Sequence, residues 1–281
     1  MSSTTTPATA PSFFRKALRQ KRFTFGFVVT LVIVVFAVVA PFVSPYGESE
    51  TAGPPYSKDG FFGTDYLGQD VLSRVMHGGQ SVLLISVLAT ILGMVVGILI
   101  GVVAAYAGGW WDEVIMRLND VLLAFPQILL SLVVLTALQN PSTWVIVVLV
   151  GAGHAPRVAR VSRGVALGIV SRDFVVAAEA LGEKRSRVIV AEVLPNMTGP
   201  LLAEAGLRLT YSIGLVAALG FLGFAADPGA ANWGQMMNEN RLGLQTQPWA
   251  VVAPVLMIGI FTIATNLMAD GLAQASQRGD D

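Results

Sequence analysis

Long uncharged apolar runs alternate with shorter polar segments along the chain. A transmembrane helix needs roughly 20 mostly apolar residues to cross a hydrocarbon core of about 30 Å, and six segments meet or approach that length. We therefore expect an all-α integral membrane protein with six transmembrane helices. The predicted spans run from about Phe25 to Ser44, Ser81 to Ala107, Val121 to Leu138, Thr143 to Ala155 with a basic helical extension past Pro156, Leu209 to Ala225, and Pro248 to Ala269.

The distribution of Lys and Arg predicts the orientation of these spans, because cytoplasmic loops near membrane helices carry basic residues in excess. Of the 18 Lys and Arg residues, only Lys58, Arg74 and Arg241 fall in segments predicted to lie outside. Six spans place both ends on one side, so both termini are expected in the cytoplasm. The apolar run of span one exceeds the 7–15 residues or so of a secretory signal peptide, and we expect this span to be retained.

These assignments divide the chain into three parts. The N-terminal cytoplasmic tail is expected to contain an interfacial helix, because Phe13, Phe14, Ala17 and Leu18 share a helical face opposite basic residues. The expected divisions are a tail at 1–24, a six-span domain at 25–272 and a second cytoplasmic tail at 273–281, with outer loops at about 45–80 and 226–247 and a cytoplasmic loop at about 156–206.

Composition supports a membrane protein and excludes some functions. Apolar residues make up 54% of the chain, which is high for a water-soluble fold. The formal net charge of zero argues against a nucleic-acid binder, since recognition of a polyanion depends on a surplus of basic residues. The absence of cysteine excludes disulfides, thiolate chemistry and Cys-ligated metals.

Span two carries a small residue at every fourth position, so one stripe of this helix lacks bulk. Such a stripe lets a neighbouring backbone approach closely. Helix packing, within the chain or between subunits, is the favoured interpretation, and a moving or pore-lining role is the alternative. The stripe consists of Ala89, Gly93, Gly97, Gly101 and Ala105.

Ionisable side chains in the hydrocarbon core usually mark a proton or ion pathway, and the predicted spans contain essentially none. Asp120 and Asp270 lie at predicted cytoplasmic ends. Glu204 and Arg208 have the i,i+4 spacing of an ion pair at the entry to span five. A proton-coupled carrier would need an intramembrane carboxylate or histidine, so the energy for transport is expected to come from elsewhere.

No catalytic or metal-binding pattern is visible in the chain. Neither His77 nor His154 has a ligand-spaced partner, so no metal site is expected. The phosphate-binding motif G-x-x-x-x-G-K-[ST] is absent, so the chain is not expected to hydrolyse ATP on the P-loop plan. A channel or transporter that needs no ATPase, and a membrane-embedded assembly protein, remain alternatives.

The segment from Phe174 to Asn196 is polar and basic although it lies between apolar spans. Asp173 can cap a short helix that ends at Gly182, since glycine readily adopts the left-handed conformation found at helix C-termini. A second, basic helix is expected to follow and to end at Leu194 and Pro195. The alanine-rich first helix has the low relief of a helix that docks in another protein's groove, or it rests on lipid headgroups.

The sequence F-V-x-A-A-x-A-L-G, followed by L-P twelve residues after the glycine, resembles the EAA loop of ABC importer permeases. Val176, Ala177, Ala178, Gly182, Leu194 and Pro195 occupy its motif positions, with Val176 where many families have Glu and Glu192 where an aliphatic residue is common. The resemblance implies that this loop forms the coupling helix that contacts an ATPase subunit. The residues so assigned are Phe174, Val176, Ala177, Ala178, Glu179, Ala180, Leu181, Gly182, Leu194 and Pro195.

The segment after span one, GTDYLGQDVLSRVMHGGQSVLL, resembles a signature of the C-type permease of dipeptide and oligopeptide importers, with Gln69 and Gln80 in place of the usual arginines. LGFLG, NWGQMM, PWAVVAP and NLMADGL resemble the closing segments of that family. Judged from its residues alone, the signature either forms tight turns, in which Asp side chains bond the local backbone, or presents a surface for an external binding protein. Its members are Gly63, Thr64, Asp65, Gly68, Asp70, Ser73 and Arg74.

Together these resemblances imply a type I ABC importer permease in the bacterial cytoplasmic membrane. They imply a homologous second permease subunit, ABC ATPase subunits that use ATP and Mg²⁺, and an extracytoplasmic peptide-binding protein as partners, with no cofactor bound by this chain. Dipeptides or oligopeptides are the implied solutes. Because the same subfamily includes nickel and other small-solute importers, such a solute is the alternative.

Overall fold

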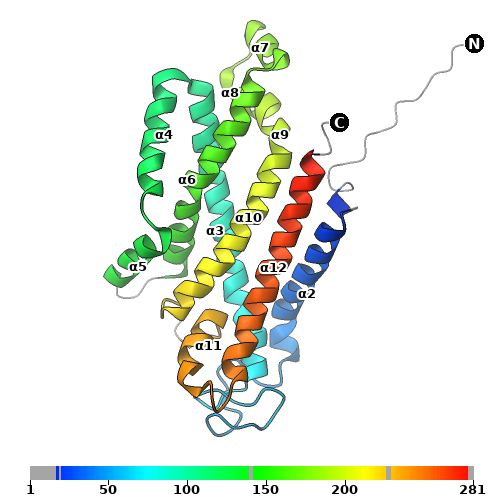
Figure 1. Ribbon diagram of the computed structural model, residues 1–281, viewed down its shortest axis with the longest axis vertical. Helices are drawn as coiled ribbons and strands as arrows, with labels where there is room; N and C mark the ends of the chain where they lie inside the picture. The colour runs from blue at the N-terminus through cyan, green and yellow to red at the C-terminus, as the bar shows by residue number, and fades with distance from the viewer. Residues whose placement is uncertain (1–16, 19, 139–141, 226–228, 278–281) are drawn as a thin grey trace, which may run out of the picture.

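The computed structural model describes residues 17–18, 20–138, 142–225 and 229–277. These residues are helical throughout apart from connecting loops and two isolated β-bridges, and the described ranges contain no strand. Figure 1 shows the longest helices running side by side along the long axis of the molecule. They are α2 (Lys21–Val43), α3 (Val71–Ala107), α6 (Thr143–Val170), α10 (Thr198–Phe221) and α12 (Trp249–Gln277).

These five helices are each long and apolar enough to cross a membrane. A sixth crossing is the pair α4 (Gly109–Leu123) and α5 (Gln127–Ala137), if the two helices, which meet at a bend of 73°, form one span. The expected all-α membrane fold is confirmed, but a continuous third span from Val121 to Leu138 was wrong. Pro126 lacks a backbone N–H and disfavours helical geometry at the residue before it, so the helix breaks there.

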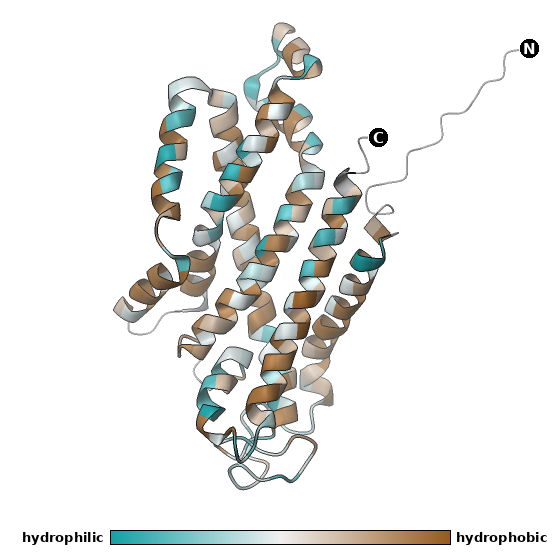
Figure 2. Ribbon diagram, viewed as in Figure 1, coloured by the Kyte–Doolittle hydropathy of each residue, from teal (hydrophilic) through white to brown (hydrophobic). Residues whose placement is uncertain are grey.

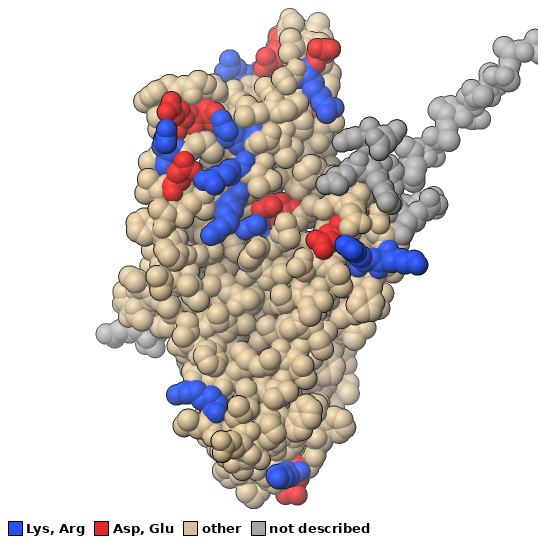
Figure 3. All heavy atoms as spheres, in the orientation of Figure 1, with Lys and Arg blue, Asp and Glu red and all other residues tan. Residues whose placement is uncertain are grey.

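The molecule has two distinct ends. The short helix α7 (Asp173–Ala180) lies at one end, together with the start of α2 and the end of α12 (Figure 1). The loop at 44–70 and the short helix α11 (Trp233–Asn240) lie at the other. We call these the α7 end and the α11 end. On the face shown in Figure 3, charged side chains gather toward the α7 end and at the tip of the α11 end, with an uncharged band between them.

The uncharged band corresponds to the apolar stretches of α2 and α12 in Figure 2. Several helices extend beyond their apolar runs. α3 begins at Val71, not Ser81, because the Asp70 carboxylate accepts a hydrogen bond of 2.8 Å from the Ser73 backbone N–H and so caps the helix. α6 continues through Pro156 as expected, and α10 already begins at Thr198.

The loops are therefore shorter than the expected 45–80 and 156–206, and they run from 44 to 70 and from 171 to 197. α2 begins at Lys21, within the tail expected at 1–24. Most of the predicted interfacial helix lies outside the described residues. The tail expected at 273–281 begins inside α12, which continues to Gln277, and only its residues 278–281 lie outside the described ranges. The loop expected at 226–247 contains α11.

The small-residue stripe lies against α6. A Cβ added to Gly97 would lie 2.5 Å from the Val158 Cβ and 2.6 Å from the Ala155 carbonyl oxygen. Gly93 and Gly101 are equally close to the α6 backbone, and Ala89 and Ala105 are buried. The stripe thus forms a backbone-to-backbone contact within this chain, and bulk at any of its glycines would separate the two helices.

Candidate functional site

At the α7 end, the loop between α6 and α10 folds as a helix, a tight turn and a second helix. α7 is followed by α8 (Arg185–Val188), and Gly182 lies in the turn between them with φ of +80°. A side chain rarely adopts this conformation, which explains the glycine at the predicted helix end. Asp173 was expected to cap α7, but Arg172 holds the cap position and Asp173 begins the helix. The carboxylate there still suits the positive end of the helix dipole.

The predicted helix end at Leu194 and Pro195 was wrong. After α8 the backbone widens into a π-helical turn (Ile189–Val193), and α9 (Leu194–Asn196) continues toward α10. A proline inside a regular α-helix loses one hydrogen bond and clashes with a preceding carbonyl. Here Pro195 lies in the first turn of α9, where no such bond is needed, so the chain passes it without leaving helical geometry.

α7 is attached to the bundle mainly by one side chain. Val175 is its one buried residue, and it belongs to an apolar cluster with Ile169 of α6 and Val188 of α8. The other face of α7 is uncovered, with Leu181, just after the helix, 85% exposed and Val176 55% exposed. Exposed apolar side chains on a short, weakly anchored helix are typical of an interaction surface.

A hollow of about 380 Å³ lies between α7 and α8. Phe174, Ala177, Ala178 and Leu181 line its α7 side, and Glu183, Arg187 and Glu192 line the opposite side. Glu183 and Arg187 form an i,i+4 ion pair of 2.9 Å across one turn. The structure thus brings four of the predicted coupling residues together around one concavity, whereas Leu194 and Pro195 lie beyond it.

A contact that sequence reasoning missed joins this loop to α3. The Tyr106 hydroxyl, in the last turn of α3, donates a hydrogen bond to the Glu179 carboxylate on α7. The Arg185 guanidinium lies 5.8 Å from the centre of the Tyr106 ring, within cation–π distance. Tyr106 and Glu179 are 73 residues apart, so no local spacing could have indicated the contact.

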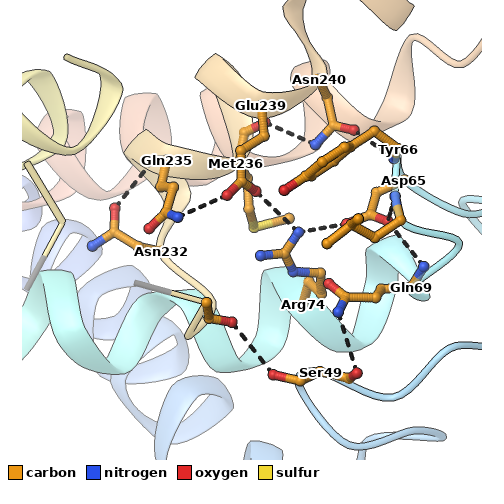
Figure 4. A network of polar contacts seen from close by, with 12 residues as sticks. Ser49, Asp65, Tyr66, Gln69, Arg74, Asn232, Gln235, Met236, Glu239 and Asn240 are labelled. Atoms are coloured by element: carbon orange, nitrogen blue, oxygen red, sulfur yellow. Dashed lines mark hydrogen bonds and ion pairs between the residues drawn. The ribbon is translucent and has the colours of Figure 1, made fainter. Parts of the chain in front are cut away.

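The outer-loop signature lies at the α11 end, and its polar side chains are buried. The Asp65 carboxylate forms an ion pair with Arg74 and accepts backbone hydrogen bonds of 2.9 Å from Leu67 and Gln69 (Figure 4). Arg74 is 1% exposed and Asp65 is fully buried. Because these groups are enclosed, they hold the loop onto the start of α3 and offer no surface to a partner in this conformation.

The remaining signature residues shape the same loop. Gly63 and Gly68 have φ of +70° and +76°, and a Cβ at Gly68 would overlap the Gly53 carbonyl oxygen at 2.1 Å. Thr64 donates a hydrogen bond of 2.6 Å from its hydroxyl to the Pro54 carbonyl oxygen. The Ser73 hydroxyl donates to the Asp70 carboxylate at 2.7 Å. All seven residues thus serve the turn and the helix start.

α11 completes this network, and the sequence had not indicated its role. Glu239 lies 3.2 Å from the Arg74 guanidinium, and the Asn240 side chain accepts a hydrogen bond of 3.0 Å from the Tyr66 backbone N–H (Figure 4). Burial and the nearby Glu239 carboxylate raise the pKa of the Tyr66 phenol above its usual value. The Trp233 indole donates a hydrogen bond of 2.7 Å to the Val75 carbonyl oxygen. α11 is therefore held against α3 at several points.

Two family models match the chain and together cover most of it. Residues 97–279 match the binding-protein-dependent transport system inner membrane component. Residues 12–58 match the N-terminal TM domain of oligopeptide transport permease C. The first match includes the α7–α8 loop, and the two matches follow one another along the sequence.

Similar proteins match the sequence of this chain over nearly its full length. A dipeptide transport system permease protein, DppC, of Alkalihalophilus pseudofirmus is 31% identical over 95% of this chain and 90% of its own. A glutathione transport system permease protein, GsiD, of Escherichia coli is 34% identical over 94% of this chain and 88% of its own. A di/tripeptide transport system permease protein, DppC, of Pseudomonas aeruginosa is 34% identical over 96% and 92%.

Among solved structures, a chain of the inward-facing MetNI methionine ABC transporter has the same fold, with a TM-score of 0.59 and 18% sequence identity. The match covers 73% of this chain and 97% of the other. The family models, the fold of the solved structure and the helix–turn–helix form of the α7–α8 loop all indicate the same kind of protein. The chain therefore belongs to the binding-protein-dependent transport system inner membrane components, the permeases of ABC importers, and within them resembles the oligopeptide permease C branch.

Proposed function

We propose that this chain is the permease subunit of an ATP-driven importer of dipeptides or oligopeptides in the bacterial cytoplasmic membrane. Family membership and several long apolar helices support a multi-pass inner-membrane protein. Peptide transport is supported by relatives whose names specify dipeptides, di- and tripeptides, and glutathione. Nickel or another small solute is the alternative within the same machine class.

In this proposal the chain supplies the path, and partner subunits supply the energy. A homologous second permease lies beside it, ABC ATPase subunits bind ATP and Mg²⁺, and an extracytoplasmic binding protein delivers the peptide. The chain has no P-loop motif of its own. The α7 end faces the cytoplasm, as the excess of Lys and Arg in its loops favours, and the α11 end faces the binding protein.

The observation that carries the proposal is the α7–α8 loop. α7 projects from the bundle, is anchored chiefly through Val175, and presents uncovered apolar side chains beside a hollow. A short helix of this kind can be carried by a partner that moves, because little burial holds it in place. When two ATPase domains close on ATP, the attached helix shifts, and the bundle changes between its outward and inward openings.

A crosslinking experiment tests the docking of α7. Because the chain contains no cysteine, Ala178→Cys introduces a unique thiol on the hollow. In the reconstituted complex it should crosslink to a cysteine in the ATPase groove, with a yield that changes between nucleotide-free and ATP-bound states. Leu242→Cys, which is 87% exposed at the α11 end, is the matched control and should not crosslink. Absence of an Ala178→Cys crosslink in every state would contradict docking.

A transport assay tests the machine class. Uptake into vesicles should require the binding protein and a catalytically competent ATPase. Uptake that persists with an inactive ATPase would instead indicate a secondary transporter or channel. Retention of nickel, and not of peptides, by the cognate binding protein would favour the alternative solute.

A further inference from the structure

A second cavity, of about 640 Å³, lies between α5, α6, α10 and α12. Its volume is within the range of about 300–1,000 Å³ that is usual for ligand pockets. The lining combines apolar side chains with Gln127, His154, Arg157, Arg208 and Tyr211. It is therefore an amphipathic cavity with two guanidinium groups, in a part of the molecule remote from the α7–α8 hollow.

Both arginines lie inside helices that qualify as membrane spans. Arg157 lies 14 residues beyond the start of α6, and Arg208 lies 13 residues before the end of α10. At 1.5 Å per residue, each lies about 20 Å along its helix from the α11 end. The sequence had assigned both positions to segments outside the spans. Guanidinium groups at such a depth are costly unless an anion or a water-filled cavity compensates them.

Among the residues that the structure describes, carboxylates compensate only one of these two charges. Arg208 forms an ion pair of 2.8 Å with Glu204, as its i,i+4 spacing predicted, and its guanidinium lies 5.0 Å from the centre of the Tyr211 ring. Arg157 donates hydrogen bonds only to neutral acceptors, the Gln127 side-chain oxygen at 3.3 Å and the Gly153 carbonyl oxygen at 3.1 Å. Among the described residues, no carboxylate pairs with Arg157, so the cavity carries an excess positive charge.

A buried group at the same cavity also lacks a partner. His154 is 2% exposed, and its Nε2 lies 2.9 Å from the Ser212 hydroxyl. Its Nδ1 is buried without a hydrogen-bond partner in the described part of the chain. Buried polar atoms are nearly always hydrogen-bonded, so the His154 side chain and Arg157 are two polar residues of this lining whose bonding capacity is not filled.

We propose that this cavity binds the carboxylate group of the solute in transit, and that Arg157 is its main contact. Guanidinium binds carboxylate through two parallel hydrogen bonds, and the Nη2 and Nε atoms of Arg157 donate no hydrogen bond to the residues described here. The inference rests on the proposed function, because every peptide with a free C-terminus carries this group. The apolar lining and Tyr211 would contact the remainder of the peptide.

The experiment compares trialanine with trialanine amide, which lacks the terminal carboxylate. The complete complex, with its binding protein and ATPase, is reconstituted in phosphatidylcholine vesicles. Arg157→Gln removes the charge and both parallel hydrogen bonds, so it should lower trialanine uptake at least roughly ten-fold, and it should change amide uptake by less than about two-fold. Arg157→Lys should restore part of the loss, because it keeps the charge without the planar fork.

The matched control is Arg160→Gln, one turn further along α6. Arg160 is paired with Asp120 at the surface, where its side chain is 61% exposed, and does not line the cavity. We expect Arg160→Gln to transport both peptides at the rates of the unmodified complex. Each variant uses the same binding protein, so the binding protein's own preference for a free carboxylate cancels in the comparison. Calorimetric titration of the complex without binding protein, using the same two peptides, measures the cavity alone.

The outcomes separate the two proposals. If the unmodified complex shows no ATP-dependent uptake of either peptide, the proposed function fails. If it transports peptides but Arg157→Gln affects trialanine and its amide equally, the carboxylate site is overturned, and an acidic side chain of the second permease is the better partner for Arg157. An equal effect that appears only when phosphatidylglycerol is added to the vesicles would assign the cavity to a lipid headgroup and would also overturn the proposal.

Discussion

The Tyr106 hydroxyl donates a hydrogen bond to the Glu179 carboxylate, and this bond joins the last turn of α3 to α7. It connects the longest helix of the bundle with the helix that we propose to dock on the ATPase. Because α7 is otherwise held mainly by Val175, the bond is one of few connections that can pass a displacement of α7 to α3.

Tyr106→Phe removes this hydrogen bond and keeps the ring beneath Arg185. We expect the amount of peptide transported per ATP hydrolysed to fall about two- to twelve-fold, since a single partly exposed hydrogen bond is worth about 0.5–1.5 kcal/mol. Parallel measurement of uptake and phosphate release in vesicles gives this ratio. Tyr46→Phe at the α11 end is the control, and an unchanged ratio in Tyr106→Phe would show that the bond does not take part in coupling.

Gly182→Val should disrupt the turn between α7 and α8. A β-branched residue at φ of +80° is strained, by about 1–2 kcal/mol. No atom lies within 4 Å of the added Cβ, so the effect is one of backbone conformation and not of packing. Uptake should fall while membrane insertion, measured by fractionation, persists. Gly182→Asn is the matched variant, and because Asn tolerates this conformation it should retain most of the activity.

Gly97→Val should weaken the contact between α3 and α6. Its Cβ alone would lie 2.5 Å from the Val158 Cβ, and overpacking of this kind costs about 1–3 kcal/mol. The expected result is a lower unfolding temperature in detergent. Gly164→Val on α6 places the same side chain where no atom lies within 4 Å of the Cβ, and it should leave the unfolding temperature nearly unchanged. Equal effects of both variants would argue against close α3–α6 packing.

Arg74→Met should loosen the loop at 44–70. It leaves the buried Asp65 carboxylate and Glu239 without their cation, and removal of one partner from a buried pair costs about 3–5 kcal/mol. Limited proteolysis should cut this loop in the variant before it cuts the unmodified protein. Arg241→Met removes an exposed arginine of the same end and is the control. Equal resistance of Arg74→Met would contradict a structural role for the network.

The helical membrane fold and five of the six expected spans could be predicted from the sequence, because the length of an apolar run has a direct physical meaning in a membrane. The ends of helices could not, as α3 shows: Val71 to Gln80 is polar enough to resemble a loop, but Asp70 caps it and Trp233 covers it. The apolar run likewise failed to show that α10 begins at Thr198, well before Arg208.

The candidate site was predictable to the extent that its signal is local. Gly182 indicates a turn by its own conformational freedom, and the alanines of α7 follow from composition. Contacts between distant segments left no such pattern. Glu239 meets Arg74 across 165 residues, and Arg157 and Arg208 line one cavity from different helices. The burial of the outer-loop signature depends on α11, which the sequence had placed only within a loop.

α3 runs without proline from Val71 to Ala107, a length of about 55 Å. One of its ends carries Arg74, inside the network beneath the outer loop, and the other carries Tyr106, against α7. Because α3 is one uninterrupted helix held by contacts at both of its ends, a displacement of one end also displaces the other. If the proposed receptor binds at the α11 end and the proposed ATPase at the α7 end, both events act on the same continuous helix.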